Sequence, residues 1–450
     1  MDIRHLYIRS IALLVLLSGP LVVYAQRQWT LDDCLEYAET HNLNIERLNT
    51  LVSQRKTALD ASRSARLPSL NAQIGENLVF ADNPELLRAI MPDGMAEALD
   101  TRNDMSMTTA TLDFSVPLYN GGKTVNRIKA DEYALSESSA SRQNAVKNLQ
   151  MQVSVYYLNC LYYRSLANVA REQVRLSESL TSKARSMVRE GVRPESDLVD
   201  AEAQLAADEF ALSDAEGVAA LALLDLAQIL NVEPDGFDIS DPDIESQAES
   251  ILLPSADELF SSASVSYPSI REMSARISAD EYRLKMAKGD YLPKLSFDAK
   301  AFTSYDAFFH KGYAHNAGSQ LDRNLIGIVG LQLDIPIFNA FQARTQVRMS
   351  EYSLKNSETD LNQAKQNLKK DIQKAYYNAS VAQRKLQSAE KAVKAAEMSE
   401  LYERKKFDSG KGNIFDLQTA GQKLLQARQN ELQTRYEFLI RYRILTFYQN

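Results

Sequence analysis

Two long stretches of the chain carry apolar residues at helical spacing and contain no proline. Residues 119–189 and 339–408 keep this spacing from end to end, so each predicts one continuous helix of roughly 105 Å at 1.5 Å per residue. Helices so much longer than the usual dozen residues, with unbroken apolar seams, are typical of coiled coils. Shorter helical patterns cover residues 43–66, 195–230, 269–291 and 414–448.

Four shorter segments alternate apolar and polar residues, which predicts strands with two unlike faces. Two of them lie within residues 69–117 and two within residues 294–336. In one segment, for example, Leu112, Phe114 and Val116 share a face. Strands of about ten residues with an apolar outer face are expected in outer-membrane proteins. An ordinary half-buried hairpin alternates in the same way, so the strands alone leave both interpretations open.

The same order of features occurs twice along the chain. Gly191 recurs as Gly410 and Asp197 as Asp416, each 219 positions later. A repeat of about 200 residues is far too long for a solenoid unit and indicates a duplicated domain. The predicted divisions are a signal peptide over 1–25, a first repeat over 26–231 with a strand hairpin at 69–117 and a helical-hairpin tip near 190–195, a linker over 232–254, and a second repeat over 255–450 with a strand hairpin at 294–336 and a tip near 409–413.

The first 25 residues have the plan of a signal peptide. Arg4 and Arg9 precede a short apolar run, and cleavage is expected after Ala25. Beyond this point no run of about 18 apolar residues occurs, which excludes transmembrane helices and leaves a closed β-barrel as the route across a membrane. Four strands are too few to close one, because the smallest membrane barrels have about eight. Copies of the chain would have to share a barrel, two giving eight strands and three giving twelve.

Composition narrows the classes of partner and of chemistry. The net charge of −8, without a basic cluster, argues against nucleic acid as a partner. The four histidines form no ligand cluster, and no nucleophile stands with a base, so we expect no metal, no cofactor and no enzyme activity. Gly121-Gly122-Lys123-Thr124 ends like a phosphate loop but lacks its first glycine, which indicates a strand-to-helix turn. The two cysteines, Cys34 and Cys160, lie among apolar residues, which favours buried free thiols over a disulfide.

Four motifs in a fixed order carry a family resemblance. They are Thr30-Leu31-Asp32-Asp33-Cys34-Leu35, Leu-Pro-Ser-Leu at 67–70, Val-Pro-Leu-Tyr-Asn-Gly-Gly at 116–122, and a Gly-x5-Asp-Leu turn at 191–198. In this order they resemble the TolC-like outer-membrane efflux duct family, across nearly the whole mature chain. The resemblance implies a mainly α fold with a membrane β-barrel. It further implies a homotrimer in the outer membrane of a Gram-negative bacterium, in which four strands per chain form a twelve-stranded barrel and long helices form a coiled-coil tunnel in the periplasm.

The resemblance also implies partners and a function. The duct would dock, through a periplasmic adaptor (membrane fusion) protein, to an inner-membrane pump, and its barrel would contact outer-membrane lipids. It would be a passive channel of a tripartite efflux or type I secretion system, exporting small molecules or polypeptides. The residues do not separate these cargoes, nor assign a role to loops 80–105 and 304–323. The alternative of another class is a periplasmic coiled-coil adaptor or scaffold, although such adaptors have one long hairpin and this chain has two.

The family's adaptor-docking positions fall on the two predicted tips. They correspond to Glu190, Gly191 and Val192 in the first repeat and to Ser409, Gly410 and Lys411 in the second. Glycine allows the positive φ that a sharp helix reversal needs, so a plain turn explains the same residues.

The family's gate carboxylates, just inside the tip, correspond to Asp416 and Thr419, with Asp197 and Asp200 as their equivalents in the first repeat. Thr419 replaces one acid of the family pair. The tip arginine that ties the family's closed state falls at Gly412, while Arg193 holds the equivalent place in the first repeat. For Asp197, an acid stabilised at a helix N-terminus is the simpler interpretation.

Overall fold

The computed structural model describes residues 28–80, 105–240, 252–308 and 317–449. The predicted signal peptide, most of loop 80–105 and part of loop 304–323 lie outside the described residues. The chain divides into two compact units, which are taken separately below: Met1–Asn49, Arg142–Pro268 and Lys365–Asn450 form the first, and Thr50–Ser141 and Ser269–Ala364 form the second. Both units draw on both sequence repeats.

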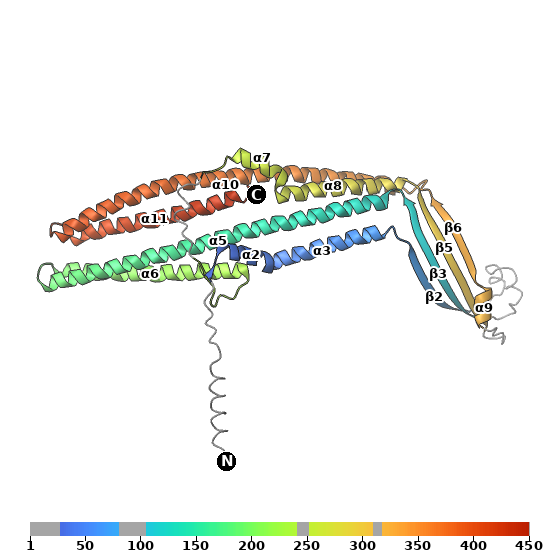
Figure 1. Ribbon diagram of the computed structural model, residues 1–450, viewed down its shortest axis with the longest axis horizontal. Helices are drawn as coiled ribbons and strands as arrows, with labels where there is room; N and C mark the ends of the chain where they lie inside the picture. Colours follow the sequence, from blue (N-terminus) through green and yellow to red (C-terminus); the bar gives the residue numbers. More distant parts are fainter. Residues whose placement is uncertain (1–27, 81–104, 241–251, 309–316, 450) are drawn as a thin grey trace, which may run out of the picture. The chain divides into compact units, whose positions relative to one another are not determined.

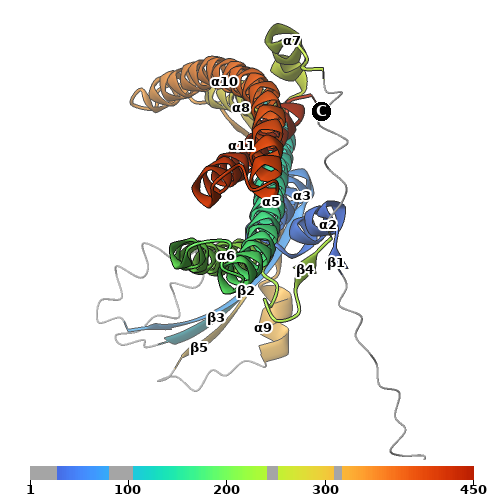
Figure 2. The same ribbon diagram turned by 90° about the vertical axis from the view of Figure 1, so that its left-hand side faces the viewer.

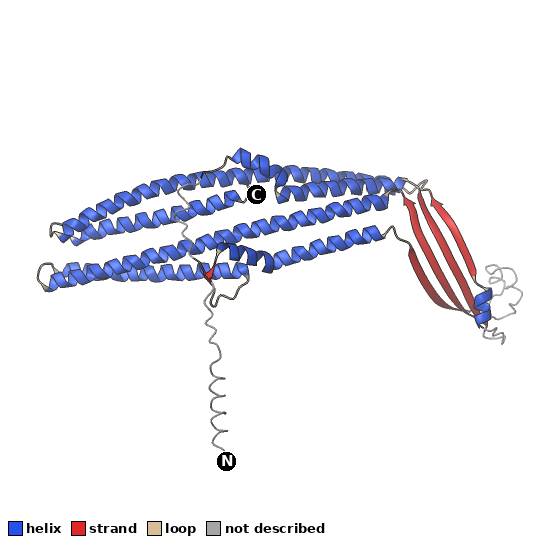
Figure 3. Ribbon diagram, in the orientation of Figure 1, coloured by secondary structure: helices blue, strands red, loops and turns tan. Residues whose placement is uncertain are grey.

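Helices make up most of the described chain (Figures 1 and 3). The six long helical patterns are all present, with ends within a few residues of the predicted ones. No proline interrupts these helices, and Gly191 and Gly410 lie just beyond the ends of the two longest. The helices are α2 (Leu31–His41), α3 (Leu43–Ser64), α5 (Lys123–Arg189), α6 (Glu195–Leu230), α7 (Ala256–Ser266), α8 (Pro268–Lys288), α9 (Ala317–Arg323), α10 (Gln342–Asp408) and α11 (Ile414–Thr446), with a 3-10 turn at Gly289–Tyr291.

The second unit contains a four-stranded antiparallel sheet in the order β2-β3-β5-β6. Its strands are β2 (Ser69–Val79), β3 (Met105–Asn120), β5 (Lys294–Phe308) and β6 (Ile326–Asp334). The register places Asn71, Asp113 and Lys300 side by side on one face and Leu70, Phe114 and Ala299 side by side on the other. One face is therefore mainly polar and the other mainly apolar, as the alternation predicts.

Strand β5 is longer than the sequence indicates. It continues to Phe308, into the segment expected to be loop 304–323, and α9 forms part of the remainder. The physical reason is that β3 pairs with β5 as far as Phe308 on one side, while on the other side α9 supplies hydrogen-bond partners where β6 no longer runs beside β5. The side-chain amide of Gln320 accepts from the Asp306 main-chain N–H at 2.9 Å and donates to its carbonyl at 3.2 Å. A side chain thus stands in for a neighbouring strand.

Strands and helices of the second unit are joined at a close approach of two glycines. Gly121, with φ of 66°, ends β3, and a Cβ placed on it would lie 2.3 Å from the Gly289 carbonyl oxygen. The neighbouring Lys123 Nζ donates to Asp290 at 2.5 Å. The Gly-Gly-Lys-Thr segment is therefore the predicted strand-to-helix turn.

The first unit has its main core where α2, α5, α6 and α11 meet. Tyr157 is 1% exposed and its hydroxyl donates to the Ser240 carbonyl at 2.8 Å. This holds the segment after β4 (Asp238–Ile239), which pairs in parallel with β1 (Gln28–Trp29). Cys34 and Cys160 belong to the same core and are both buried free thiols. Seen from the tip end, α5 lies beside α6 and α10 beside α11 (Figure 2). Among the described residues, no helix combines the length and apolarity that crossing a bilayer requires.

Candidate functional site

The first hairpin of the first unit, α5 and α6, reverses direction in a turn of five residues. After α5 ends at Arg189, Gly191 adopts a left-handed φ of 73°, and the Val192 amide donates to the Met187 carbonyl at 2.9 Å. This arrangement satisfies carbonyls that a helix end would otherwise leave without partners. Only glycine takes such a φ without strain, which explains its presence in the turn.

The second hairpin, α10 and α11, repeats this turn. Gly410 has the same φ of 73°, and the Lys411 amide donates to the Lys406 carbonyl at 2.9 Å. The predicted tips therefore lie where the sequence places them, and a Cβ on either glycine would meet nothing within 4 Å. All six predicted docking residues are exposed: Glu190, Gly191, Val192, Ser409, Gly410 and Lys411.

The two tips contact each other within one chain. Arg193 Nη2 donates to the Gly412 carbonyl oxygen at 2.8 Å, and its guanidinium lies over the Phe407 ring, 5.1 Å from the centroid. A second bridge joins Lys183 Nζ to Asp408 at 2.6 Å. Beneath these polar contacts lies a small apolar core, formed by Ala184, Ala201, Phe407, Ile414 and Leu417.

The predicted gate residues have unlike surroundings. Asp197 lies 3.8 Å from Arg193 and its side chain is 15% exposed. Asp200 and Asp416 are exposed, and Thr419 is half-buried. The Asp416 main-chain N–H is capped by the Asn413 side chain at 2.7 Å. Among the described residues of one chain, no hydrogen bond or ion pair joins the pair on α11 to the pair on α6.

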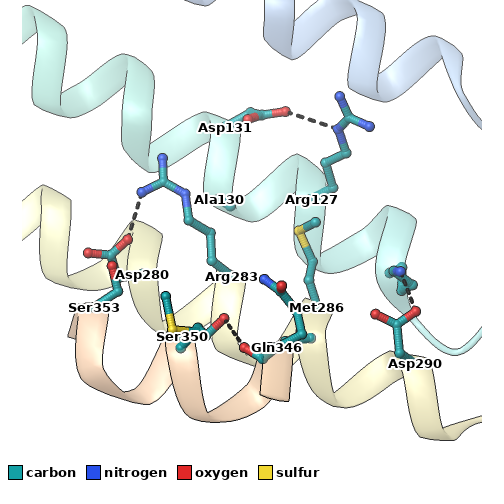
Figure 4. Close-up of a pocket in the computed structure, with 13 residues that line it drawn as sticks. Arg127, Ala130, Asp131, Asp280, Arg283, Met286, Asp290, Gln346, Ser350 and Ser353 are labelled. Carbon is teal, nitrogen blue, oxygen red and sulfur yellow. Dashed lines mark hydrogen bonds and ion pairs between the residues drawn. The ribbon is translucent and has the colours of Figure 1, made fainter. Parts of the chain in front are cut away.

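A separate pocket of about 640 Å³ lies in the second unit, among α5, α8 and α10 (Figure 4). Its charges face one another in pairs: Lys123 with Asp290 at 2.5 Å, Arg283 with Asp280 at 2.6 Å and Arg127 with Asp131 at 3.9 Å. Because each charge has a partner of opposite sign, the lining offers no unbalanced charge to a ligand. Within the described part of the chain, no three His, Cys, Asp or Glu side chains gather as a metal site would require.

Sequence reasoning identified the tip turns but not the contacts between them. Phe407 and Lys183 were not predicted as tip residues. The available indication was that Arg193 and Gly412, the two contacting residues, occupy equivalent positions of the repeat, 219 apart. Equivalent turns that lie together bring equivalent residues close.

Comparisons with known proteins identify the family of the chain. A family model described as outer membrane efflux protein matches residues 35–232 and 259–448. The outer membrane efflux protein BepC of Brucella suis is 21% identical over 392 residues, covering 86% of this chain and 78% of the relative. The outer membrane protein TolC of Vibrio cholerae is 23% identical over 409 residues, covering 88% of this chain and 86% of the relative.

Solved structures show the same fold. The chain superposes on CusC with a TM-score of 0.76 at 15% identity, covering 95% of both chains. It superposes on the outer membrane protein VceC of Vibrio cholerae with a TM-score of 0.72 at 17% identity, covering 93% of this chain and 96% of that one. The chain belongs to the outer membrane efflux protein family and is an outer-membrane duct protein of a Gram-negative bacterium.

Proposed function

We propose that three copies of the chain form a passive export duct, with a shared twelve-stranded barrel in the outer membrane and a helical tunnel in the periplasm. The observation that carries this proposal is the sheet of the second unit. Among the described residues, β2 pairs only with β3 and β6 only with β5, so both edges of the sheet are open. In hydrocarbon an open edge leaves main-chain groups unpaired, at several kcal/mol each. Neighbouring copies would supply the missing strands.

The two faces of the sheet suit a barrel with lipid outside and water inside. On one face, Leu70 is 63% exposed, Ile74 is 79% exposed and Leu331 is 67% exposed. On the other, the Lys300 ammonium lies 3.6 Å from the Asp113 carboxylate. Apolar side chains facing lipid and polar side chains facing a lumen are the pattern of membrane strands. The alternative, a periplasmic adaptor or scaffold, would expose this large apolar face to water instead of lipid.

The exposed tips are the docking surface in this proposal. A periplasmic adaptor would bind the turns at Gly191 and Gly410, and an inner-membrane pump behind it would supply the energy. The acids Asp197, Asp200 and Asp416, with Thr419, would ring the tunnel mouth when three chains meet, and like charges brought together would attract cations. Both efflux and type I secretion fit, since one relative is named an efflux protein and another, of Pseudomonas aeruginosa, an alkaline protease secretion protein.

The test is the native mass of the protein extracted in mild detergent from purified outer membranes, together with export by a strain lacking the chain. Three copies per particle, and loss of export of at least one cargo in the deletion strain, are expected. A particle of two copies would contradict the twelve-stranded barrel. A monomer found in the soluble periplasmic fraction would remove the duct and favour the scaffold alternative.

A further inference from the structure

The two helical hairpins are equivalent residue for residue. α5 and α10 each contain 67 residues, and the starts, ends and tip glycines all differ by 219 positions. Each contact between the two hairpins therefore defines an equivalent contact, in which every residue is exchanged for the one 219 positions away in the other hairpin. Within the described residues of one chain that equivalent has no partner, because they contain two long hairpins, α5–α6 and α10–α11.

The contacts between the hairpins of one chain form an internal seam along the first unit. Lys183 of α5 bonds Asp408 of α10 at 2.6 Å, and Ser165 of α5 lies 3.1 Å from the hydroxyl of Tyr436 on α11. Tyr436 is 8% exposed, and Ile440, one turn further along α11, packs on the same core. One face of the first hairpin thus receives one face of the second.

Each residue of the internal seam has an equivalent 219 positions away in the other hairpin, and these equivalents form a second set of residues. Lys183 becomes Tyr402, and Asp408 becomes Arg189 of a following first hairpin. Tyr162, whose ring lies 5.8 Å from that of Tyr436 and which lines the same pocket as Ile440, becomes Val381, and Ile440 becomes Leu221. This second set is exposed: Tyr402 is 57%, Val381 42% and Leu221 61% exposed, and Arg189 is exposed as well.

We propose that these two faces bind each other between copies of the chain, so that Tyr402 of one copy contacts Arg189 of the next and Val381 contacts Leu221 of the next. The inference rests on the proposed duct of several copies and assigns its interface and register. It continues the internal seam around the ring, with each hairpin using one face for its own chain and the other for a neighbouring chain.

The chemistry of the paired faces is complementary although the residues differ from those of the internal seam. A guanidinium over a phenol ring, as at Arg189 and Tyr402, is a favourable cation–π pair. The residue equivalent to Tyr436 is Gly217, where a Cβ would meet nothing within 4 Å. In the proposed interface, the open space beside Gly217 of one copy would face Arg384 of the other copy, the equivalent of Ser165. The exposed carboxylate of Asp214, one turn from Gly217, has the charge opposite to that of Arg384.

The second hairpin has a groove where the incoming face would lie. It has a volume of about 600 Å³ and is lined by Val381, Arg384 and residues of α11. In this groove Lys385 is paired with Glu437 at 3.4 Å, which leaves the positive charge of Arg384 for an acid from outside. Leu221 and Asp214 of the next copy supply the apolar and the acidic group at that level.

The test is cross-linking of the detergent-extracted protein with a short bis-maleimide. The variant carrying Arg189→Cys and Tyr402→Cys should give covalent dimers and trimers on a denaturing gel. The native thiols do not interfere because Cys34 and Cys160 are 0% and 3% exposed. The variant carrying Lys183→Cys and Asp408→Cys should react within one chain and migrate as a monomer.

The register has its own control. Lys391 is exposed on the same face of α10 as Tyr402, eleven residues or roughly 16 Å away. The variant carrying Arg189→Cys and Lys391→Cys should give at least tenfold less cross-linked oligomer. A trimer by mass with no 189–402 product, or with equal products at 391 and 402, overturns this interface and leaves the duct intact. A monomer by mass overturns both.

A second variant tests the apolar contact without cysteine. Leu221→Asp places a charge at an exposed site, so the fold of one chain should tolerate it, while the trimer should dissociate at a several-fold lower detergent concentration. Leu252→Asp, at a leucine that is 91% exposed and outside the proposed interface, is the matched control and should leave the trimer unchanged. Equal trimer stability in both variants would contradict the proposed contact.

Discussion

Arg193 and Gly412 hold equivalent positions in the two repeats, and they contact each other: the guanidinium of one donates to the main-chain carbonyl of the other at 2.8 Å. The contact depends on the two residues being different. A Cβ at Gly412 would lie 3.0 Å from the main-chain nitrogen of Phe407, so the second tip has little room for a side chain. Divergence after duplication has therefore left a donor on one tip and an accessible acceptor on the other.

Replacing Arg193 by alanine should loosen the tips. The hydrogen bond from a charged donor and the stacking on Phe407 together contribute about 2 kcal/mol, or roughly thirtyfold in the ratio of closed to open tips. Basal conductance of the variant in planar bilayers should rise. Arg185→Ala is the control, because the Arg185–Glu202 pair is largely exposed and such pairs contribute little. A closed-state conductance equal in both variants would show that Arg193 does not restrain the tips.

Asp416→Asn should weaken block of the channel by divalent cations. Asp416 is exposed, so in a ring of copies its charge is available to cations, whereas Asp197 already lies 3.8 Å from Arg193. Asp197→Asn should therefore change the block less than Asp416→Asn does. The measurement is conductance against divalent concentration for both variants. The same block in wild type and Asp416→Asn would exclude Asp416 from the gate.

The sequence predicted what depends on local pattern. The bounds of α6 and the two tip glycines follow from periodicity, from the lack of internal proline and from glycine's access to positive φ. The positions of the four strands also follow from the alternation along the chain. These features are local, so one sequence suffices to predict them.

Long-range contacts were beyond that reasoning. The hydrogen bond from Arg193 is accepted by a main-chain carbonyl, which every residue possesses, so no pattern of side chains predicts it. The extension of β5 depends likewise on long-range partners: β3, which pairs with it as far as Phe308, and Gln320, whose side chain satisfies the main chain of Asp306. Such partners are set by tertiary packing, which periodicity does not describe.

Gly410→Trp should abolish export and leave trimer and membrane insertion unchanged. The turn is exposed and a Cβ there meets nothing within 4 Å, so a bulky side chain blocks an incoming partner without disturbing the chain's own core. The backbone strain of a left-handed residue, about 1–2 kcal/mol, is shared by the control Gly410→Asn, which is small and tolerates this conformation best. Export, native mass and membrane fraction are measured for both. Normal export by Gly410→Trp would contradict adaptor docking at this tip.

Gly121→Ala should destabilise the second unit far more than Gly122→Ala. Both glycines have positive φ, 66° and 74°, so both substitutions carry about 1–2 kcal/mol of backbone strain. At Gly121 the new methyl would also lie 2.3 Å from the Gly289 carbonyl oxygen, which adds about 1–3 kcal/mol for overpacking, whereas at Gly122 its nearest neighbour is a side chain at 3.6 Å. Thermal loss of helical circular dichroism and the yield of folded protein report the difference. Equal melting temperatures would show that the strand–helix junction adapts to the methyl group.

Cys34 and Cys160 should resist maleimide at pH 8 in the folded protein and react once it is unfolded. Burial raises the pKa of both thiols from 9.0 to about 12, and both are nearly inaccessible.

The same pKa shift makes the stability of the protein depend on pH, because the folded state holds the thiol protons more tightly than the unfolded chain does. The resulting stabilisation is complete below pH 9 and is lost as the pH rises from 9 to 12, by about 1.4 kcal/mol per pH unit for each thiol. The free energy of unfolding of wild type should therefore fall steeply above pH 9. A variant carrying Cys34→Ala and Cys160→Ala should lose less stability over the same range, although it starts lower because the bond from Cys160 Sγ to the Ala222 carbonyl is gone. Parallel pH profiles for the two proteins would mean that the thiols do not titrate with unfolding.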